Sequence, residues 1–299
     1  MSSNPLVFDR RLLRARHARA AALGPATFLI DRVAEDLADR LAAVSRRFER
    51  AVDLGTPTHA ACRVLAGSGK AGLIVAAGAQ AQATSHVHAV VAADEEAFPF
   101  REGSLDLVVS ALALQFVNDL PGTLVQIRRA LRPDGLLLAA LVGGDTLTEL
   151  RQAFAIAEAA VEGGISPRVI PFVDVSDAGG LLQRAGFALP VTDVERLTVR
   201  YGSPIELMHD LRRMGAANPL IERRRRPLAY ATFARMMEVY TERFVDSDGR
   251  IRATFDIVWL SGWAPHQSQQ KPRAPGSATH RLADALGVSE VSTGEKAGR

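Results

Sequence analysis

The sequence predicts an α/β fold, in which helices cover a mostly parallel sheet of seven strands that ends in an antiparallel edge hairpin. Short apolar runs, rich in small and β-branched residues, alternate along the chain with segments whose apolar residues recur at helical spacing. Continuous apolar runs of this kind are typical of parallel strands buried on both faces. With 47% hydrophobic and 23% charged residues, the 299-residue chain has the composition of a globular protein.

The elements follow one another in a regular order. A basic segment, residues 1–24, carries no acid after Asp9, and an amphipathic helix over residues 25–45 follows it. Asn118 or Asp119 is placed to cap a later helix, and residues 132–135 form a tight turn into a strand. The predicted strands are 51–54, 73–76, 89–92, 105–110, 136–142, 187–199 and 251–259, and the further helices are 119–131, 146–162, 176–185, 203–214 and 230–244.

These elements indicate one main domain over residues 25–263. Helical insertions are expected to form a lid on this domain. Residues 264–299 are rich in proline, glutamine and serine, which predicts a flexible C-terminal tail with one weak helix at 278–286.

Composition excludes several classes of protein. A single cysteine, Cys62, excludes an intrachain disulfide and a multi-cysteine zinc site, and indicates a reducing compartment. No apolar stretch reaches the roughly 20 residues that span a bilayer. The run Arg223–Arg226 lacks the interleaved aromatics of a nucleic-acid site, so we interpret it as a solvated loop or helix end; an acidic protein or the surface of a membrane is the alternative partner.

One long segment carries a family resemblance. The sequence VVAADEEAFPFREGSLDLVVSALALQFVNDLPGTLVQIRRALRPDGLLLAALVGGDTLTELRQAF, with Phe8-Asp9-Arg10, GGISPRVIPF, ELMHDLRRMGAANPL and GWAPHQSQ elsewhere, resembles class I S-adenosylmethionine (SAM) methyltransferases. It is most similar to the complex I assembly branch, which is associated with arginine hydroxylation, and more distantly to the biotin-pathway malonyl carrier-protein methyltransferases. The resemblance implies a Rossmann-like class I methyltransferase fold. Because Phe8-Asp9-Arg10 belongs to the family pattern, we expect no targeting extension and a cytoplasmic protein.

The resemblance also implies a cofactor, SAM, at the carboxyl ends of the first, second and fourth strands. The glycine motif that approaches the cofactor opens with Asp53 and Gly55, but Pro57 and His59 replace its next two glycines. No acid lies between Asp53 and Asp94, so the usual ribose carboxylate is missing, and Gln80 or Gln82 is left as a neutral substitute. The expected cofactor-binding residues are Asp53, Gly55, Thr56, Ala77, Asp94, Glu95 and Gln115.

Several of these residues also have a plain structural interpretation. Asp94 is placed either to bind adenine or to cap the turn before Phe98, and Gln115 is a better site candidate than Phe116, which has the character of a core residue. Cys62 is interpreted as a small core residue and Asp145 as a helix cap. His86 and His88 lack the carboxylate of a metal triad, so no metal site is predicted. Asp210, Met214 and Asn218 are candidates for a lid on the substrate side.

The resemblance implies a methyltransferase-family protein that acts on or with a protein partner, such as a subunit of respiratory complex I. The residues define no nucleophile, paired carboxylates or metal cluster, and no catalytic residue is predicted. The alternative is a degenerate methyltransferase fold that serves as an assembly chaperone or scaffold. Pro57, His59 and the missing carboxylate favour the scaffold, whereas Asp94, Glu95 and residues 111–116 favour a ligand site.

Overall fold

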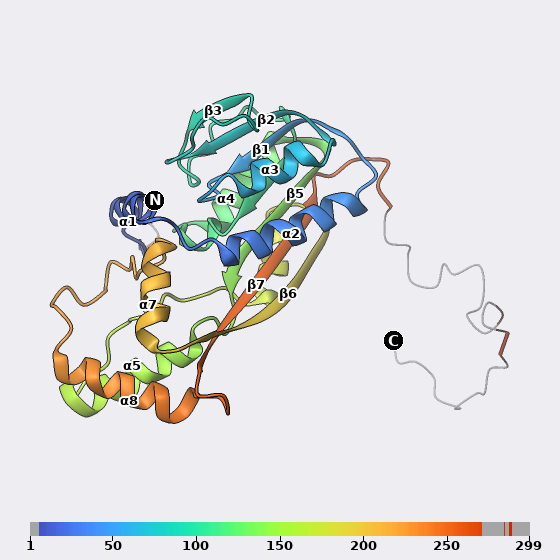
Figure 1. Ribbon diagram of the computed structural model, residues 1–299. Helices are drawn as coiled ribbons and strands as arrows, with labels where there is room; N and C mark the ends of the chain where they lie inside the picture. Colours follow the sequence, from blue (N-terminus) through green and yellow to red (C-terminus); the bar gives the residue numbers. More distant parts are fainter. Residues whose placement is uncertain (1–5, 271–283, 285–286, 289–299) are drawn as a thin grey trace. The chain divides into compact units, whose positions relative to one another are not determined.

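A single seven-stranded sheet forms the centre of the computed structural model, which describes residues 6–270, 284 and 287–288 (Figure 1). The order of its strands is β3-β2-β1-β4-β5-β7-β6. Residues 1–265 form one compact unit, and residues 266–299 belong to another. The predicted tail helix at 278–286 lies almost entirely outside the described residues. None of the described helices is both long and apolar enough to cross a bilayer.

Five strands run parallel and two do not. The parallel strands are β1 (Phe48–Leu54), β2 (Ala71–Gly78), β3 (Ala89–Ala92), β4 (Leu105–Ala111) and β5 (Leu131–Gly143). β7 (Ile251–Trp263) lies antiparallel between β5 and β6 (Ala188–Tyr201). The predicted α/β class and the antiparallel edge pair are therefore confirmed.

Helices cover both faces of the sheet because each has one apolar side. One face is covered by α2 (Phe28–Ala43), α3 (Ala60–Gly67), α5 (Thr148–Glu162), α7 (Pro204–Arg213) and α8 (Tyr230–Phe244), and the other by α4 (Leu120–Ala130) and α6 (Val175–Arg184). Leu41, Leu107 and Trp259 are buried on the first face, and Leu124, Leu137 and Leu182 on the second. The core therefore lies in two layers, on opposite sides of the strands.

The turn signals act locally as the sequence indicates. Asp119 caps α4 by accepting the amide N–H of Gly122 at 2.8 Å. Residues 132–135 interrupt the pairing of β4 with β5, so that the register jumps from Leu105↔Leu131 to Leu107↔Leu136. Asp134 takes a positive φ of 66° in this turn.

The basic N-terminal segment is helical, which the sequence analysis did not predict. α1 (Arg10–Leu23) begins after Asp9, whose side chain accepts the amide N–H of Leu12 at 2.9 Å. Phe8 pairs with Leu220 in an isolated bridge, and the guanidinium of Arg16 donates to the carbonyls of Ala217 and Asn218. These contacts hold α1 beside the end of α7, close to the carboxyl ends of the parallel strands.

Candidate functional site

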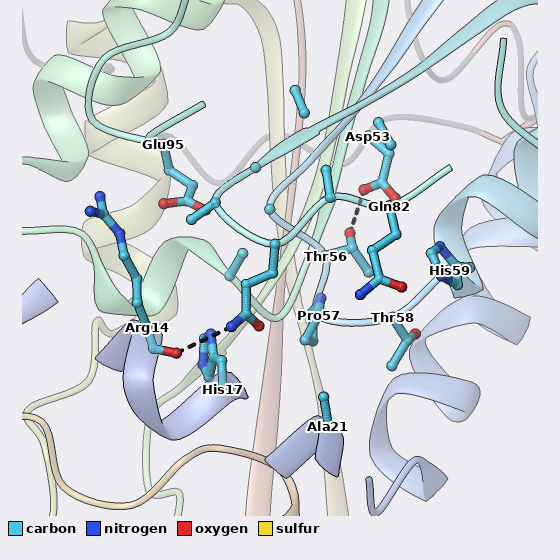
Figure 2. Close-up of a pocket in the computed structure, with 18 of the residues that line it drawn as sticks. Arg14, His17, Ala21, Asp53, Thr56, Pro57, Thr58, His59, Gln82 and Glu95 are labelled. Atoms are coloured by element: carbon cyan, nitrogen blue, oxygen red, sulfur yellow. Dashed lines mark hydrogen bonds between the residues drawn. The ribbon is translucent and has the colours of Figure 1, made fainter. Parts of the chain in front are cut away.

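A cavity of about 240 Å³ opens at the carboxyl ends of β1 and β2. In a parallel sheet this is the edge where ligands bind, beside the point at which the strand order reverses between β1 and β4. Figure 2 shows Arg14 and His17 of α1 on one side of the cavity, and Pro57 and His59 of the turn after β1 on another. Two segments far apart in sequence therefore enclose one pocket.

Asp53, the last but one residue of β1, forms part of the cavity floor. Its carboxylate accepts hydrogen bonds from the hydroxyl of Thr56 and from the thiol of Cys62, the latter at 3.1 Å. Burial raises the pKa of Asp53 to about 6, although these two neutral donors oppose the shift. No ion pair to Asp53 exists among the described residues, so this buried acid lacks a cation.

Gly55 is a position where the backbone requires glycine. Its φ is +72°, and its amide N–H donates to the carbonyl of Ala77 at 2.7 Å. A Cβ atom built there would lie 2.7 Å from Oε1 of Glu95 and 3.0 Å from the side chain of Ala113. A glycine turn usually leaves space for a ligand to approach the backbone. Here the carboxylate of Glu95 occupies that space.

Glu95 is held there by α1. The guanidinium of Arg10 makes ion pairs with Glu95 and, at 3.0 Å, with Asp94, while Arg14 makes a second ion pair with Asp94. Arg10 and Glu95 are both largely buried, with 15% and 10% of their side chains exposed. Burial alone would raise the pKa of Asp94, but the N–H of Glu96 and the two guanidinium groups bring it below its usual range.

The structure therefore brings five of the seven predicted cofactor residues to the main cavity. Asp53, Gly55, Thr56, Ala77 and Glu95 line it, and Thr56 also ties β1 to β4 by accepting the N–H of Ala111 at 3.1 Å. Asp94 does not line the cavity; it pairs with Arg10 and Arg14 and also accepts the N–H of Glu96, which makes it a cap of the turn.

Gln115 does not line the main cavity. It lines two smaller cavities of about 90 and 110 Å³, together with Phe116 and Met214, and the first of these shares His17 and Pro57 with the main cavity. Its Nε2 donates to the carbonyl of Leu112 at 2.8 Å, and its Oε1 is buried without a hydrogen-bond partner among the described residues. Phe116 is buried and packs edge-on against Phe8 and His17, so it belongs to a small core as well as to the cavity wall.

The sequence analysis missed the contribution of α1. Arg10, Arg14 and His17 line the main cavity, and their spacing of three or four residues places them on one face of the helix. That spacing could have indicated the face, but not the acids it meets. Burial and the nearby charge of Arg10 lower the pKa of His17 to about 4, so this ring is neutral at pH 7.

The predictions for Cys62, Asp145 and His88 have different outcomes. Cys62 is fully buried on α3, as expected of a core residue. The expectation that Asp145 caps a helix is wrong: its carboxylate accepts from Arg196 at 2.7 Å, and α5 begins after Leu147 without a side-chain cap. His88 accepts the backbone N–H of Ile74 at 3.0 Å, and the described residues hold no group of three or more metal-ligating side chains.

The three lid candidates separate into lining and supporting residues. Met214 lines both small cavities and Asn218 one of them, whereas Asp210 lines none of the three cavities. The side-chain amide of Asn218 donates to the carbonyl of Pro167 at 2.7 Å. Its backbone carbonyl accepts from Arg16, so this segment fixes α1 in place over the sheet.

These residues do not fit SAM in the way that the family resemblance implies. The ribose hydroxyls would meet Ala77 and neutral amides such as Gln82 instead of a carboxylate, and Pro57 offers no N–H. Glu95, which the resemblance places at the cofactor, is already paired with Arg10.

Comparison with known proteins finds the same fold in solved structures and a methyltransferase domain in the sequence. Residues 52–139 match the model of a methyltransferase domain. Two solved structures, BH2331 of Bacillus halodurans and YcgJ of Bacillus subtilis, superpose with a TM-score of 0.51 each, at 16% and 13% identity. They cover 77% and 78% of this chain and 98% and 99% of their own. They support the fold alone.

Curated relatives extend over nearly the whole chain. The mitochondrial arginine-hydroxylase NDUFAF5 of Danio rerio is 36% identical over 295 residues, covering 96% of this chain and 92% of that protein. The human protein of the same name is 40% identical over 281 residues, covering 91% and 81%. A malonyl-[acyl-carrier protein] O-methyltransferase of Laribacter hongkongensis is 35% identical over 284 residues, covering 86% and 90%.

Proposed function

The chain belongs to the methyltransferase-domain family of the NDUFAF5 arginine-hydroxylases, and from this premise we propose that it acts with a protein partner in the assembly of respiratory complex I. Similarity along nearly the full length of those relatives supports a shared biological role better than a shared domain alone would. We place this role in the cytoplasm, with the partner a subunit of the complex.

This role has two forms, which differ in whether the main cavity binds SAM. In the methyltransferase form, SAM lies against Gly55, surrounded by Asp53, Thr56, Ala77 and Glu95, while Asp94 and Gln115 act from outside the cavity wall. In the scaffold form, the fold is retained for binding a partner and the cavity no longer serves methyl transfer.

The scaffold form is the function that the site supports best, and one observation carries it. The carboxylate of Glu95 lies 2.7 Å from the Cβ position of Gly55 and is paired with Arg10, so the chain fills its own glycine turn. Loss of the ribose carboxylate adds to this, because Ala77 cannot replace a charge-assisted hydrogen bond. We therefore propose that SAM binds this protein weakly or not at all, and we assign no reaction step to it.

Calorimetric titration with SAM and with S-adenosylhomocysteine tests the proposal. We expect no heat of binding at micromolar ligand and no thermal stabilisation of the protein at millimolar ligand. Micromolar binding of SAM would overturn the scaffold form and restore the methyltransferase form.

A gain-of-function variant sharpens the test. Pro57→Gly with Ala77→Asp returns a flexible turn and an acid at the end of β2, and Arg10→Gln frees Glu95. If the cavity is an eroded SAM site, the triple variant binds SAM at least tenfold more tightly than the natural chain. Ala79→Asp in place of Ala77→Asp adds the same charge nearby and serves as the matched control.

A further inference from the structure

The edge of the sheet at β3 lacks the features that usually keep an edge strand from pairing with another strand. β3 is the first strand in the order of the sheet, and Figure 1 shows it at the outer margin, so the described part of the chain places no strand beyond it. An open edge presents unpaired backbone N–H and C=O groups, which proteins usually guard with charged side chains, proline or bulges. Residues 71–93 form β2, β3 and their connection, and they include no Lys, Arg, Asp, Glu or Pro.

The opposite edge of the sheet, at β6, has all three kinds of protection. Pro190 lies within an irregularity in the register of β6 with β7. Asp193 of β6 makes an ion pair with Arg40 of α2 at 2.6 Å, and Glu195 makes one with Arg32 at 2.7 Å. The absence of charge and proline is therefore particular to the β3 edge.

Apolar side chains are exposed around this unguarded edge. Residues 79–88, which connect β2 to β3, contain no helix, whereas α3 connects β1 to β2 and α4 connects β4 to β5. Val90 of β3 is 38% exposed and Leu73 of β2 is 41% exposed, and Ala89 and Ala92 are exposed as well. A surface that is depleted in charge and exposes apolar side chains has the composition of the centre of a protein interface.

The backbone of β3 shows which groups are open to a further strand. The N–H of His88 donates to the carbonyl of Ile74 on β2 at 2.8 Å. Alternate residues of a strand direct their backbone groups to opposite sides, so those of Val90 also face β2. The N–H and C=O groups of Ala89 and Val91 therefore point to the open edge.

We propose that β3 pairs antiparallel with β3 of a second copy of this chain, which joins two sheets across a twofold axis. In this register Ala89 exchanges two backbone hydrogen bonds with Val91 of the second copy, and Val90 lies opposite its own counterpart on the axis. A second copy suits this edge because a strand without charged side chains meets no like-charge repulsion when it pairs with itself. A twofold interface also requires a surface that is complementary to itself.

Sedimentation equilibrium of the full chain tests this inference. We expect the mass to rise from that of one chain toward that of two as the protein concentration increases. V90R places two guanidinium groups against each other on the axis and should weaken dimerisation roughly tenfold or more. V194R makes the same change at a valine of β6 that is 47% exposed, and this matched control should leave dimerisation unchanged. Circular dichroism of each variant checks that it is folded.

A cysteine at position 90 tests the register directly. In a pair of opposite residues without mutual hydrogen bonds the Cα atoms lie about 4.5 Å apart, a distance that a disulfide can bridge. The natural Cys62 is buried, so we expect V90C to form disulfide-linked dimers under mild oxidation and V194C to remain uncross-linked.

Three results would overturn the proposal. The first is the mass of a single chain at every concentration, including the case in which this edge binds an extended segment of a different protein. The second is a dimer that V194R disrupts and V90R does not. The third is V90C cross-linking no faster than V194C.

Discussion

Two regions of the sheet bury carboxylates, and they surround them differently. At the carboxyl end of β5, Asp256 of β7 accepts two hydrogen bonds at 2.8 Å from the guanidinium of Arg196, and a third from the N–H of Asp145. At the carboxyl end of β1, the hydrogen bonds that Asp53 accepts from the described residues come from the neutral groups of Thr56 and Cys62 alone. Both carboxylates are buried, so both carry the cost of leaving water.

The pKa values record this difference. Burial acts to raise both, but the hydrogen bonds and charge of Arg196 bring the pKa of Asp256 below its usual range, whereas that of Asp53 rises to about 6. The Asp256 carboxylate is therefore neutralised by an arginine of the same sheet. Asp53 has no such ion pair among the described residues, whereas Glu95, in the same cavity, is paired with Arg10 of α1.

The largest expected effect comes from removing that cation. Arg10→Gln leaves Glu95 buried without its partner, and breaking such a pair costs about 3–4 kcal/mol of unfolding free energy. Denaturant unfolding measures the loss. Arg14→Gln is the matched control on the same helix, because its side chain is 47% exposed and Asp94 keeps Arg10; it should cost less than about 1 kcal/mol.

A double variant separates charge from packing at this position. If Arg10 stabilises the protein by neutralising Glu95, then Glu95→Gln should recover much of the stability that Arg10→Gln loses. Strictly additive losses in the double-mutant cycle would show that α1 is held by its apolar contacts instead, and the comparison between the two carboxylate regions would lose its basis.

The second expected effect is a dependence on pH. The pKa of Asp53 is higher in the folded protein, about 6, than its ordinary value of 3.8, so the folded state favours the protonated acid. Its contribution to stability is fully present below pH 3.8 and is lost as the pH rises to about 6. Asp53→Asn removes this loss, so its stability relative to the natural chain should rise by up to about 3 kcal/mol between pH 4 and pH 7.

Chemical unfolding of both proteins across that range measures the difference. Thr56→Val keeps the carboxylate but deletes a hydrogen-bond donor to it, so it should move the pH-dependent loss toward higher pH. A stability difference between Asp53→Asn and the natural chain that does not change with pH would contradict the raised pKa.

The sequence predicted the sheet more completely than the site, for a physical reason. Each predicted strand appears in the sheet within a few residues, because a continuous apolar run is a local property that burial on both faces requires. The turn at residues 132–135 and the cap at Asp119 are local too. Such features depend on residues that are neighbours in the sequence, so they can be predicted from it.

The site depends instead on contacts between distant segments. Arg10 and Glu95 are 85 residues apart, and nothing near either of them in the sequence indicates that they pair. The missing ribose acid and the replacement of glycine by Pro57 could be predicted, since they are departures from a family pattern. That Glu95 itself occupies the space beside Gly55 could not, because it follows from where α1 packs.

The smallest expected effect concerns Asp256, the carboxylate that is paired with Arg196. Arg196→Gln deprives Asp256 of its cation, but the Arg196 side chain is 57% exposed and Asp256 keeps the N–H of Asp145, so we expect a loss of about 1–2 kcal/mol. Arg200→Gln removes an arginine of similar exposure on the same strand, whose partners Asp246 and Asp248 lie nearer the surface. Its loss should stay below about 1 kcal/mol. Equal losses of stability in thermal unfolding would contradict this expectation. They would show that burial of the carboxylate does not determine how much its arginine stabilises the protein, and the contrast between Asp256 and Asp53 would need another cause.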